Sequence, residues 1–283
     1  MRRRIDPVDL LLHVWGGLVF IFLFLPIVMI VIYSFNVGRL MVAWQGFGLN
    51  AYHAAIADPG IRAAIGVSLR AGVGASLVAT ILGTLAGVAL ARRPGPWVPL
   101  FVGILGLTLV TPEIVDAVSL LPWFVWLGTD AHVTVFNNGL IRLIVGHSLF
   151  ATAVVTFIVR ARIAGLDESL EEAAADLYAP PWNRFRQITL PLLMPAVLAG
   201  ALMSFTLSLD DTIISAFVQV SGSTPWPVYI FSALRAALRP QIAAMSTLML
   251  GLTLLAISMV AVVLRRSGES STQIAGTLAG GGV

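Results

Sequence analysis

Long, uninterrupted apolar runs dominate the chain and are separated by short stretches rich in polar residues, glycine and proline. A helix rises ~1.5 Å per residue, so roughly 20 apolar residues cross the ~30 Å hydrocarbon layer of a bilayer. The pattern predicts an all-α integral membrane protein of about six transmembrane helices in a single domain, residues 1–266. The predicted helices cover about residues 14–33, 64–91, 98–127, 139–159, 190–220 and 243–264.

The segments outside these runs differ in character. The first run follows Arg2-Arg3-Arg4, is longer than the apolar part of a typical signal peptide and lacks a small-residue cleavage site, so we expect an uncleaved first helix. Residues 36–62 are polar and turn-rich, which predicts a loop. A charged, amphipathic stretch at 167–189 lies between the fourth and fifth helices, and the Gly/Ser/Thr-rich tail 267–283 is predicted to be disordered.

Composition strengthens the membrane assignment and excludes several functions. The chain is 58% hydrophobic and 11% charged, contains no cysteine, and has only arginine among its 17 basic residues. Without lysine it can be neither a P-loop ATPase nor a Schiff-base enzyme, so any ATP must be bound by another polypeptide. The four histidines show no metal-ligand spacing, and no hydrolase motif occurs. We therefore predict a non-enzymatic chain that has no cofactor or metal of its own.

Arginine placement predicts the orientation in the membrane. If the N-terminus is cytoplasmic, eleven arginines lie on that side and six on the other, which favours cytoplasmic N- and C-termini. The basic pI of about 9.9 is explained by these helix-end arginines, so no nucleic-acid partner is expected. The cytoplasmic set is Arg2, Arg3, Arg4, Arg92, Arg93, Arg160, Arg162, Arg184, Arg186, Arg265 and Arg266.

The stretch between the fourth and fifth helices predicts two short helices. Acidic residues and good helix formers run to Leu177, Ala179-Pro180-Pro181 interrupts them, and proline suits the first turn of a second helix. Trp182 and Phe185 lie three residues apart, on one face of that helix. The stretch could be a partner-binding segment or an ordinary loop on the membrane surface.

Four carboxylates interrupt the third and fifth runs: Glu113, Asp116, Asp210 and Asp211. A charged side chain at the bilayer centre costs roughly 2.5–3.5 kcal/mol, so such residues usually face a cavity or a partner. With membrane entries near Val98 and Pro195, both acidic pairs lie about 22 Å from the cytoplasmic edge. We therefore expect the two pairs at one level.

These acids have several interpretations. Arg142 could pair with one, or backbone amides, helix ends and water could satisfy them. Alternatively they line a pathway for a cationic solute, with Trp123 and Trp226 adding cation–π contacts unless these form an interfacial belt. A stand-alone cation carrier or channel, or a structural membrane subunit, would fit the same residues.

Two motifs resemble known families. Glu172-Ala173-Ala174, Leu177, Phe185 and Leu190-Pro191 resemble the EAA loop of bacterial ABC importer permeases, with Tyr178 at the usual glycine position. The resemblance implies coupling helices that dock into an ATPase subunit. The docking residues that it implies are Glu171, Glu172, Ala173, Ala174, Leu177, Tyr178, Pro181, Arg184, Phe185 and Pro191.

The second motif concerns the solute. Pro112-Glu113-Ile114-Val115 with Ser119-Leu120-Leu121, and the run from Ser204 to Asp211, resemble segments of spermidine/putrescine permeases, especially their second permease subunit. Ser34-Phe35-Asn36 and Trp44-Gln45-Gly46-Phe47 agree more weakly. The resemblance implies polyamine import by alternating access in a bacterial inner membrane. It also implies a second permease subunit, two ATPase subunits that bind ATP and Mg, and an extracytoplasmic solute-binding protein. Permeases for iron or amino-acid-like solutes share the architecture and remain alternatives.

Overall fold

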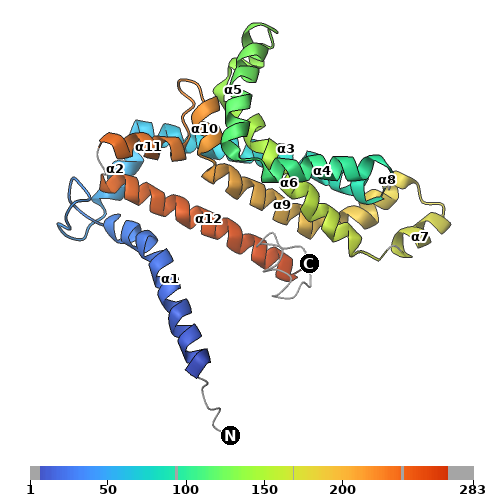
Figure 1. The fold of residues 1–283 in the computed structure, drawn as a ribbon, viewed down its shortest axis with the longest axis horizontal. Coiled ribbons are helices and arrows are strands. Elements are labelled where there is room, and N and C mark those ends of the chain that lie inside the picture. Colours follow the sequence, from blue (N-terminus) through green and yellow to red (C-terminus); the bar gives the residue numbers. More distant parts are fainter. Residues whose placement is uncertain (1–6, 93–94, 168, 237–238, 267–283) are drawn as a thin grey trace. The chain divides into compact units, whose positions relative to one another are not determined.

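The computed structural model describes residues 7–92, 95–167, 169–236 and 239–266, and within them every regular element is a helix (Figure 1). The predicted disordered tail, 267–283, lies outside the described residues. The elements are α1 Pro7–Tyr33, α2 Asn50–Ala57, α3 Pro59–Arg92, α4 Trp97–Val110, α5 Glu113–Thr129, η1 Thr134–Asn137, α6 Gly139–Ala164, α7 Ser169–Asp176, α8 Pro181–Arg184, η2 Phe185–Thr189, α9 Leu190–Asp210, α10 Ile213–Val218, α11 Trp226–Ala236 and α12 Pro240–Arg266.

Among the described residues, five helices are long and apolar enough to cross a membrane, and a bent helix pair raises the number to six if it counts as one span. This agrees with the predicted all-α membrane protein of about six spans. The spans are Leu10–Tyr33, Pro59–Arg92, Gly139–Ala164, Pro181–Asp210 and Pro240–Met259, and the bent pair is α4 with α5.

The predicted continuous helix over 98–127 is wrong, because the chain breaks between α4 and α5. Thr111 and Pro112 are extended, with ψ of 130° and 129°, and the two helix axes differ by 102°. Proline disfavours the helical conformation of the residue before it, so α4 ends at Val110. The break makes Glu113 the first residue of a new helix.

The predicted helix over 190–220 is also divided. Helix α9 ends at Asp210, Asp211 is extended with ψ of 106°, and the short helix α10 begins at Ile213. At its other end α9 begins at Leu190, as predicted, but α8 and the π-helical segment η2 lead into it, so the continuous helical span is Pro181–Asp210.

The described residues form two compact units, one within residues 63–229 and 253–266 and the other within residues 7–62 and 230–252. In the first unit α3, α6 and α9 lie side by side (Figure 1). A Cβ atom added at Gly83 would lie 2.6 Å from Val155 Cβ, and one at Gly87 would lie 2.9 Å from Val159 Cβ. Gly83 and Gly87 form the small-xxx-small pattern that lets membrane helices approach closely.

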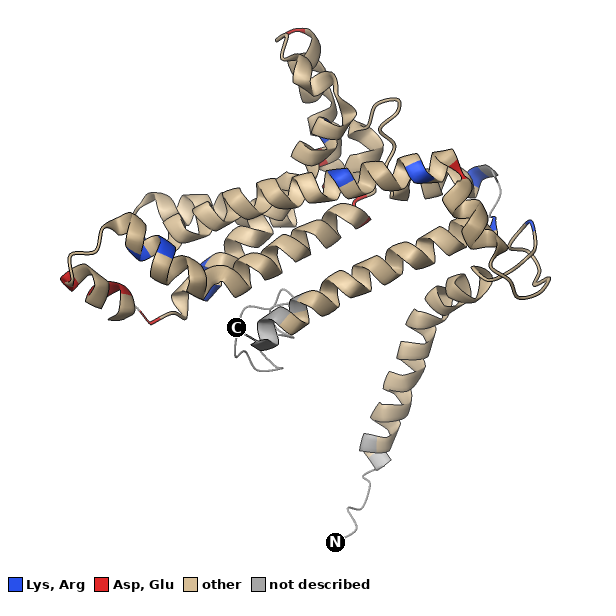
Figure 2. Cartoon of the chain, turned by 180° about the vertical axis from the view of Figure 1, so that it is seen from behind, with Lys and Arg blue, Asp and Glu red and all other residues tan. Residues whose placement is uncertain are grey.

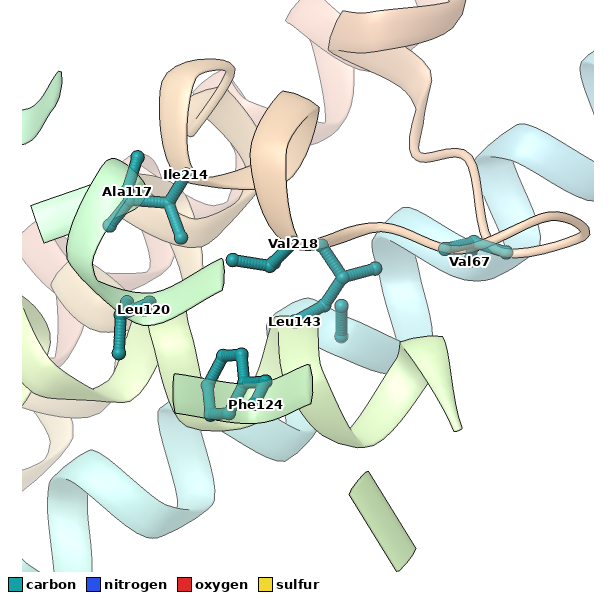
Figure 3. Close-up of a cluster of buried hydrophobic side chains, with 8 residues drawn as sticks. Val67, Ala117, Leu120, Phe124, Leu143, Ile214 and Val218 are labelled. Carbon is teal, nitrogen blue, oxygen red and sulfur yellow. The ribbon is translucent and has the colours of Figure 1, made fainter. Parts of the chain in front are cut away.

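A second packing centre joins α3, α5, α6 and α10. Its buried side chains come from all four helices, with Phe124 and Leu143 completely shielded (Figure 3). Ile214 and Val218 of α10 pack against the α5 face that carries Ala117 and Leu120. This cluster fixes α10 against α5, so the residues at the starts of these two helices are held close together.

In the other unit, the two weaker sequence motifs contact each other. Phe35 stacks on Phe47 with ring centroids 5.1 Å apart, and Asn36 forms an isolated antiparallel bridge with Phe47. The side-chain Nδ2 of Asn36 donates to the Ala43 carbonyl at 2.9 Å, and its Oδ1 accepts the backbone N–H of Gln45 at 2.9 Å. The two motifs are therefore the two sides of one folded turn.

The prediction that residues 36–62 form a loop is wrong beyond residue 49. Residues 50–57 form α2, and α3 already begins at Pro59. The Asp58 carboxylate accepts the backbone N–H groups of Gly60 and Ile61 at 2.8 and 3.1 Å, which caps α3 with proline in its first turn. Asp58-Pro59-Gly60 thus starts a helix, although the same residues are typical of a turn.

We predict that Gly87→Val destabilises the unit built on α3 and α6, because overpacking costs about 1–3 kcal/mol and the nearest atoms include the Thr156 backbone oxygen at 2.9 Å. Thermal unfolding of the detergent-purified protein would show a lower midpoint. The matched control is Gly103→Val in α4, where an added Cβ meets nothing within 4 Å. Equal midpoints for the two variants would contradict the close α3–α6 approach.

Candidate functional site

The four carboxylates stand at helix joints and not in the middle of regular helices. Glu113 is the first residue of α5 and Asp116 lies one turn later. Asp210 is the last residue of α9, and Asp211 lies in the extended joint before α10. Asp210 and Asp211 therefore do not follow the 100° spacing that adjacent residues have on a continuous helix.

The fold brings the two acidic pairs together, as expected from their positions along the third and fifth runs. The carboxyl group of Glu113 interacts with the side chain of Asp211 and lies near the charges of Asp210 and Asp116. Glu113 and Asp210 are exposed, whereas Asp116 and Asp211 are half-buried. Figure 2 shows acidic positions, in red, where α5, α9 and α10 meet. We call these four residues the acidic cluster.

Asp211 also has a local structural role. Its Oδ1 accepts the backbone N–H of Ser215, in the first turn of α10, at 3.3 Å. For Asp211, a backbone N–H group thus satisfies one carboxylate oxygen, as one of the alternative interpretations of the acids required. The bond uses one carboxylate oxygen, so the other oxygen and the negative charge remain able to bind a cation.

His147 is the buried neighbour of the acidic cluster and was not expected there. It lies on α6 and is 4% exposed. Its Nδ1 lies 2.6 Å from Ser208 Oγ on α9, and its Nε2 lies 2.9 Å from Ser215 Oγ on α10. The same Nε2 is 3.8 Å from Asp211 Oδ2. A histidine in the middle of an apolar run was the available signal, because ionisable residues there mark functional sites.

The other residues expected near the cluster lie elsewhere. In the described part of the chain Arg142 pairs with no carboxylate, and its Nε donates to the Phe136 carbonyl. It lies more than one turn before His147 on α6, which removes it from the level of the acids. Trp123 is half exposed and packs on Phe124. Trp226 is 4% exposed and donates its backbone N–H to Ser68 Oγ at 2.8 Å, so it is a core residue in this conformation.

The segment between α6 and α9 forms the two short helices that were predicted, α7 and α8. Helix α7 ends in a Schellman motif, with Ala179 N–H bonded to Ala174 O at 3.0 Å and Tyr178 N–H to Ala175 O at 2.9 Å. Tyr178 is the left-handed residue of this motif, with φ of 57°. The turn therefore keeps the conformation that glycine adopts without strain, although tyrosine occupies it.

Glu171 anchors this segment to the rest of its unit. Its Oε1 lies 2.8 Å from Arg92 Nη2 at the end of α3 and accepts the Thr189 hydroxyl at 2.7 Å. Arg92 and Thr189 were not among the predicted site residues, because contacts between residues so far apart in sequence leave no local pattern. The remaining expected residues lie in three elements: Glu172, Ala173 and Ala174 in α7, Pro181 and Arg184 at the ends of α8, and Pro191 in the first turn of α9.

Apolar side chains of this segment project into solvent. Leu177 is 82% exposed, Tyr178 94% and Trp182 67%, and the Trp182 ring lies 5.8 Å from that of Phe185. Exposed apolar groups gathered on one segment are typical of a protein-binding surface. We call Leu177, Tyr178, Trp182 and Phe185 the apolar face of the loop.

A bundle of membrane-crossing helices with an exposed loop and intramembrane acids defines a membrane transport component. The chain belongs to the family of binding-protein-dependent transport system inner membrane components, whose model matches residues 79–269. It is an integral inner-membrane protein and the permease component of such a system. Because the family works with separate binding proteins, the chain is one part of an assembly.

Curated relatives cover most of the chain. It is 40% identical over 238 residues to the putrescine transport system permease protein PotI of Escherichia coli K12, covering 82% of this chain and 83% of the relative. It is 33% identical over 254 residues to the spermidine/putrescine transport system permease protein PotC of the same strain, covering 90% and 94%. PotC of Haemophilus influenzae is 35% identical over 252 residues, with coverage of 89% and 95%.

A solved structure shows the same fold. In the crystal structure of a bacterial ABC transporter involved in the import of the acidic polysaccharide alginate, one chain matches with a TM-score of 0.64 at 15% identity. The match covers 94% of this chain and 98% of that chain. At this level of identity the likeness concerns the fold alone.

We predict that Tyr178→Gly stabilises the end of α7 by about 1 kcal/mol, because glycine removes the strain of the left-handed conformation. Hydrogen–deuterium exchange of a peptide covering residues 173–180 would become slower. Leu177→Gly is the matched control: it removes a neighbouring exposed side chain without relieving positive φ, and exchange should become faster. Faster exchange in both variants would contradict the strained turn.

Proposed function

We propose that this permease component translocates polyamines such as putrescine and spermidine. The acidic cluster at the joints of α5 and α9 is the single observation on which the proposal rests. Carboxylates this close repel one another unless a proton or a cation lies between them. An elongated amine with several ammonium groups supplies such cations, and relatives named for putrescine and spermidine transport support this choice.

The exposure of the acids divides their roles. Glu113 and Asp210 are exposed and can meet a solute directly, whereas Asp116 and Asp211 are half-buried and add charge behind them. Trp123 is exposed enough for a cation–π contact, but it lies ten residues after Glu113 on α5 and therefore away from the cluster. Trp226 can contact a solute only if α11 moves, because the residue is buried in the present conformation. An iron or amino-acid-like solute is a weaker candidate, because the relatives that cover most of this chain are named for putrescine and spermidine transport.

The proposed mechanism is alternating access driven by partners. Two ATPase subunits bind ATP and Mg, a second permease subunit (identical or different) completes the pathway, and an extracytoplasmic binding protein delivers the solute. Both termini of this chain lie in the cytoplasm, as the arginine distribution favours. The chain itself holds no cofactor.

The loop between α6 and α9 docks the ATPase in this proposal. Leu177, Tyr178 and Trp182 of its apolar face are exposed, and the first two lie before the span Pro181–Asp210. Glu171 fastens the loop to Arg92 and Thr189. A partner that covers the apolar face and moves it therefore pulls on the ends of α3 and α9 together. This gives ATP binding a mechanical route to the acidic cluster.

We predict that Asp211→Asn abolishes most ATP-driven uptake of radiolabelled putrescine into proteoliposomes while leaving assembly and thermal stability unchanged. Asparagine caps a helix about as well as aspartate, so the bond to Ser215 survives and only the charge is lost. Asp210→Asn should act similarly. The control is Asp130→Asn at the end of α5, an exposed acid that no interaction ties to the cluster.

Three outcomes separate the alternatives. Unchanged putrescine uptake by the Asp210→Asn/Asp211→Asn variant would refute the acidic pathway, as would a preference for anionic solutes. Uptake by the isolated chain without ATP would identify a stand-alone carrier or channel. Loss of assembly in Asp211→Asn would assign the acid a structural role alone.

We predict that Phe185→Asp reduces ATP-driven uptake at least about tenfold and weakens co-purification of the ATPase, since a buried charge at an interface costs several kcal/mol. Glu172→Arg should have the same direction of effect. Phe185→Leu is the control, because leucine keeps the apolar face. Full uptake by Phe185→Asp would count against a docking loop.

A further inference from the structure

The imidazole of His147, on α6, bridges the two helices that flank the joint between α9 and α10. Ser208 lies three residues before Asp211 and Ser215 four residues after it, and both hydroxyls bond the same ring at 2.6 and 2.9 Å. All three side chains are at least nine-tenths buried. His147 therefore links a residue before the extended joint to a residue after it, and Asp211 lies between these two residues in the chain.

We propose that His147 is a positioning residue of the transport pathway, which holds the α9–α10 joint so that the Asp211 carboxylate faces Glu113. The inference rests on the proposed function, because it concerns the same acidic cluster. His147 itself is buried and does not contact the solute. It acts through Ser208 and Ser215, whose separation sets the direction of Asp211.

The geometry favours this role over simple core packing. Simple packing needs volume, but each ring nitrogen of His147 has its own hydroxyl partner, on different helices. Nε2 also lies 3.8 Å from Asp211 Oδ2, the oxygen that is not bonded to Ser215 N–H. One oxygen of Asp211 is thus fixed by α10 and the other lies beside the imidazole, which leaves a single orientation for the carboxylate.

The bridge also explains a polar group in an otherwise apolar helix. The α6 neighbours of His147 on its buried face include Leu143 and Ala151, both in hydrophobic clusters. An apolar residue at 147 would pack equally well but would leave two buried hydroxyls without their partner. Burying a hydroxyl without a hydrogen bond is unfavourable, so the joint would rearrange to find other partners.

The test compares His147→Leu with His147→Gln in the complete transporter, with its ATPase, second permease and binding protein, reconstituted in proteoliposomes. Leucine keeps the volume and loses both bonds, whereas glutamine can still donate and accept. We expect His147→Leu to lower putrescine taken up per ATP hydrolysed on the order of tenfold, with His147→Gln recovering most of it. A residue with only a structural role would lower uptake and ATP hydrolysis together and leave their ratio unchanged.

A second measurement follows the joint directly. The chain contains no native cysteine, so spin labels can be placed at Leu198→Cys in α9 and Ala216→Cys in α10, with partner cysteines replaced. We expect the distribution of label distances to broaden in His147→Leu and to stay narrow in His147→Gln. If His147→Leu does not assemble, Ser208→Ala/Ser215→Ala removes the same two bonds from the other side and should give the same broadening and the same lower ratio.

The outcomes separate this inference from the proposed function. A normal uptake ratio and a narrow distribution in His147→Leu, together with lost uptake in Asp211→Asn, would overturn the positioning role and leave polyamine transport intact. Unchanged uptake in Asp211→Asn would instead remove the function on which the inference rests. Additive losses for His147→Leu and the double serine variant would also contradict it, because a shared bridge makes them non-additive.

Discussion

A peptide group in the hydrocarbon layer has no water to bond, so each break in a membrane helix needs polar partners from the protein itself. Among the described residues, apolar runs break after Val110 and after Asp210, and each break starts a new helix. At the second break the Asp211 carboxylate accepts the backbone N–H of Ser215, and His147 joins side chains of α9 and α10. The position of the acidic cluster follows from these joints.

The joints also explain why four acids need no arginine beside them. The start of a helix carries partial positive charge and free N–H groups, both of which favour a carboxylate. Glu113 and Asp116 lie in the first turn of α5, and Asp211 precedes α10. Helix ends therefore stabilise the negative charge only in part, which is consistent with the proposal that a cationic solute completes the balance. A fixed partner such as Arg142 would hold the acids permanently, and it bonds a carbonyl instead.

Sequence reasoning predicted the membrane helices and the acids because run length and isolated charges are local signals. It missed both breaks because apolar residues continue on each side of them. The short polar interruptions Thr111-Pro112 and Asp210-Asp211 were treated as part of one helix. It set His147 aside by looking for metal-ligand spacing, while its partners lie 61 and 68 residues away in the chain. The left-handed turn at Tyr178 was foreseeable from the glycine usually found there, whereas the Arg92–Glu171 pair arises only from the tertiary fold.

One continuous helix connects the two candidate sites. It spans Pro181–Asp210, 30 residues, which is about 45 Å of helix from the apolar face of the loop to the α9–α10 joint. Helices are stiff along their axes, so a displacement of α8 reaches the joint unless the helix bends. Its irregular part is η2, where π-helical geometry follows α8 and Thr189 is tied to Glu171. In the proposed mechanism this helix carries motion from the loop to the acidic cluster, and η2 is the irregular segment along its length.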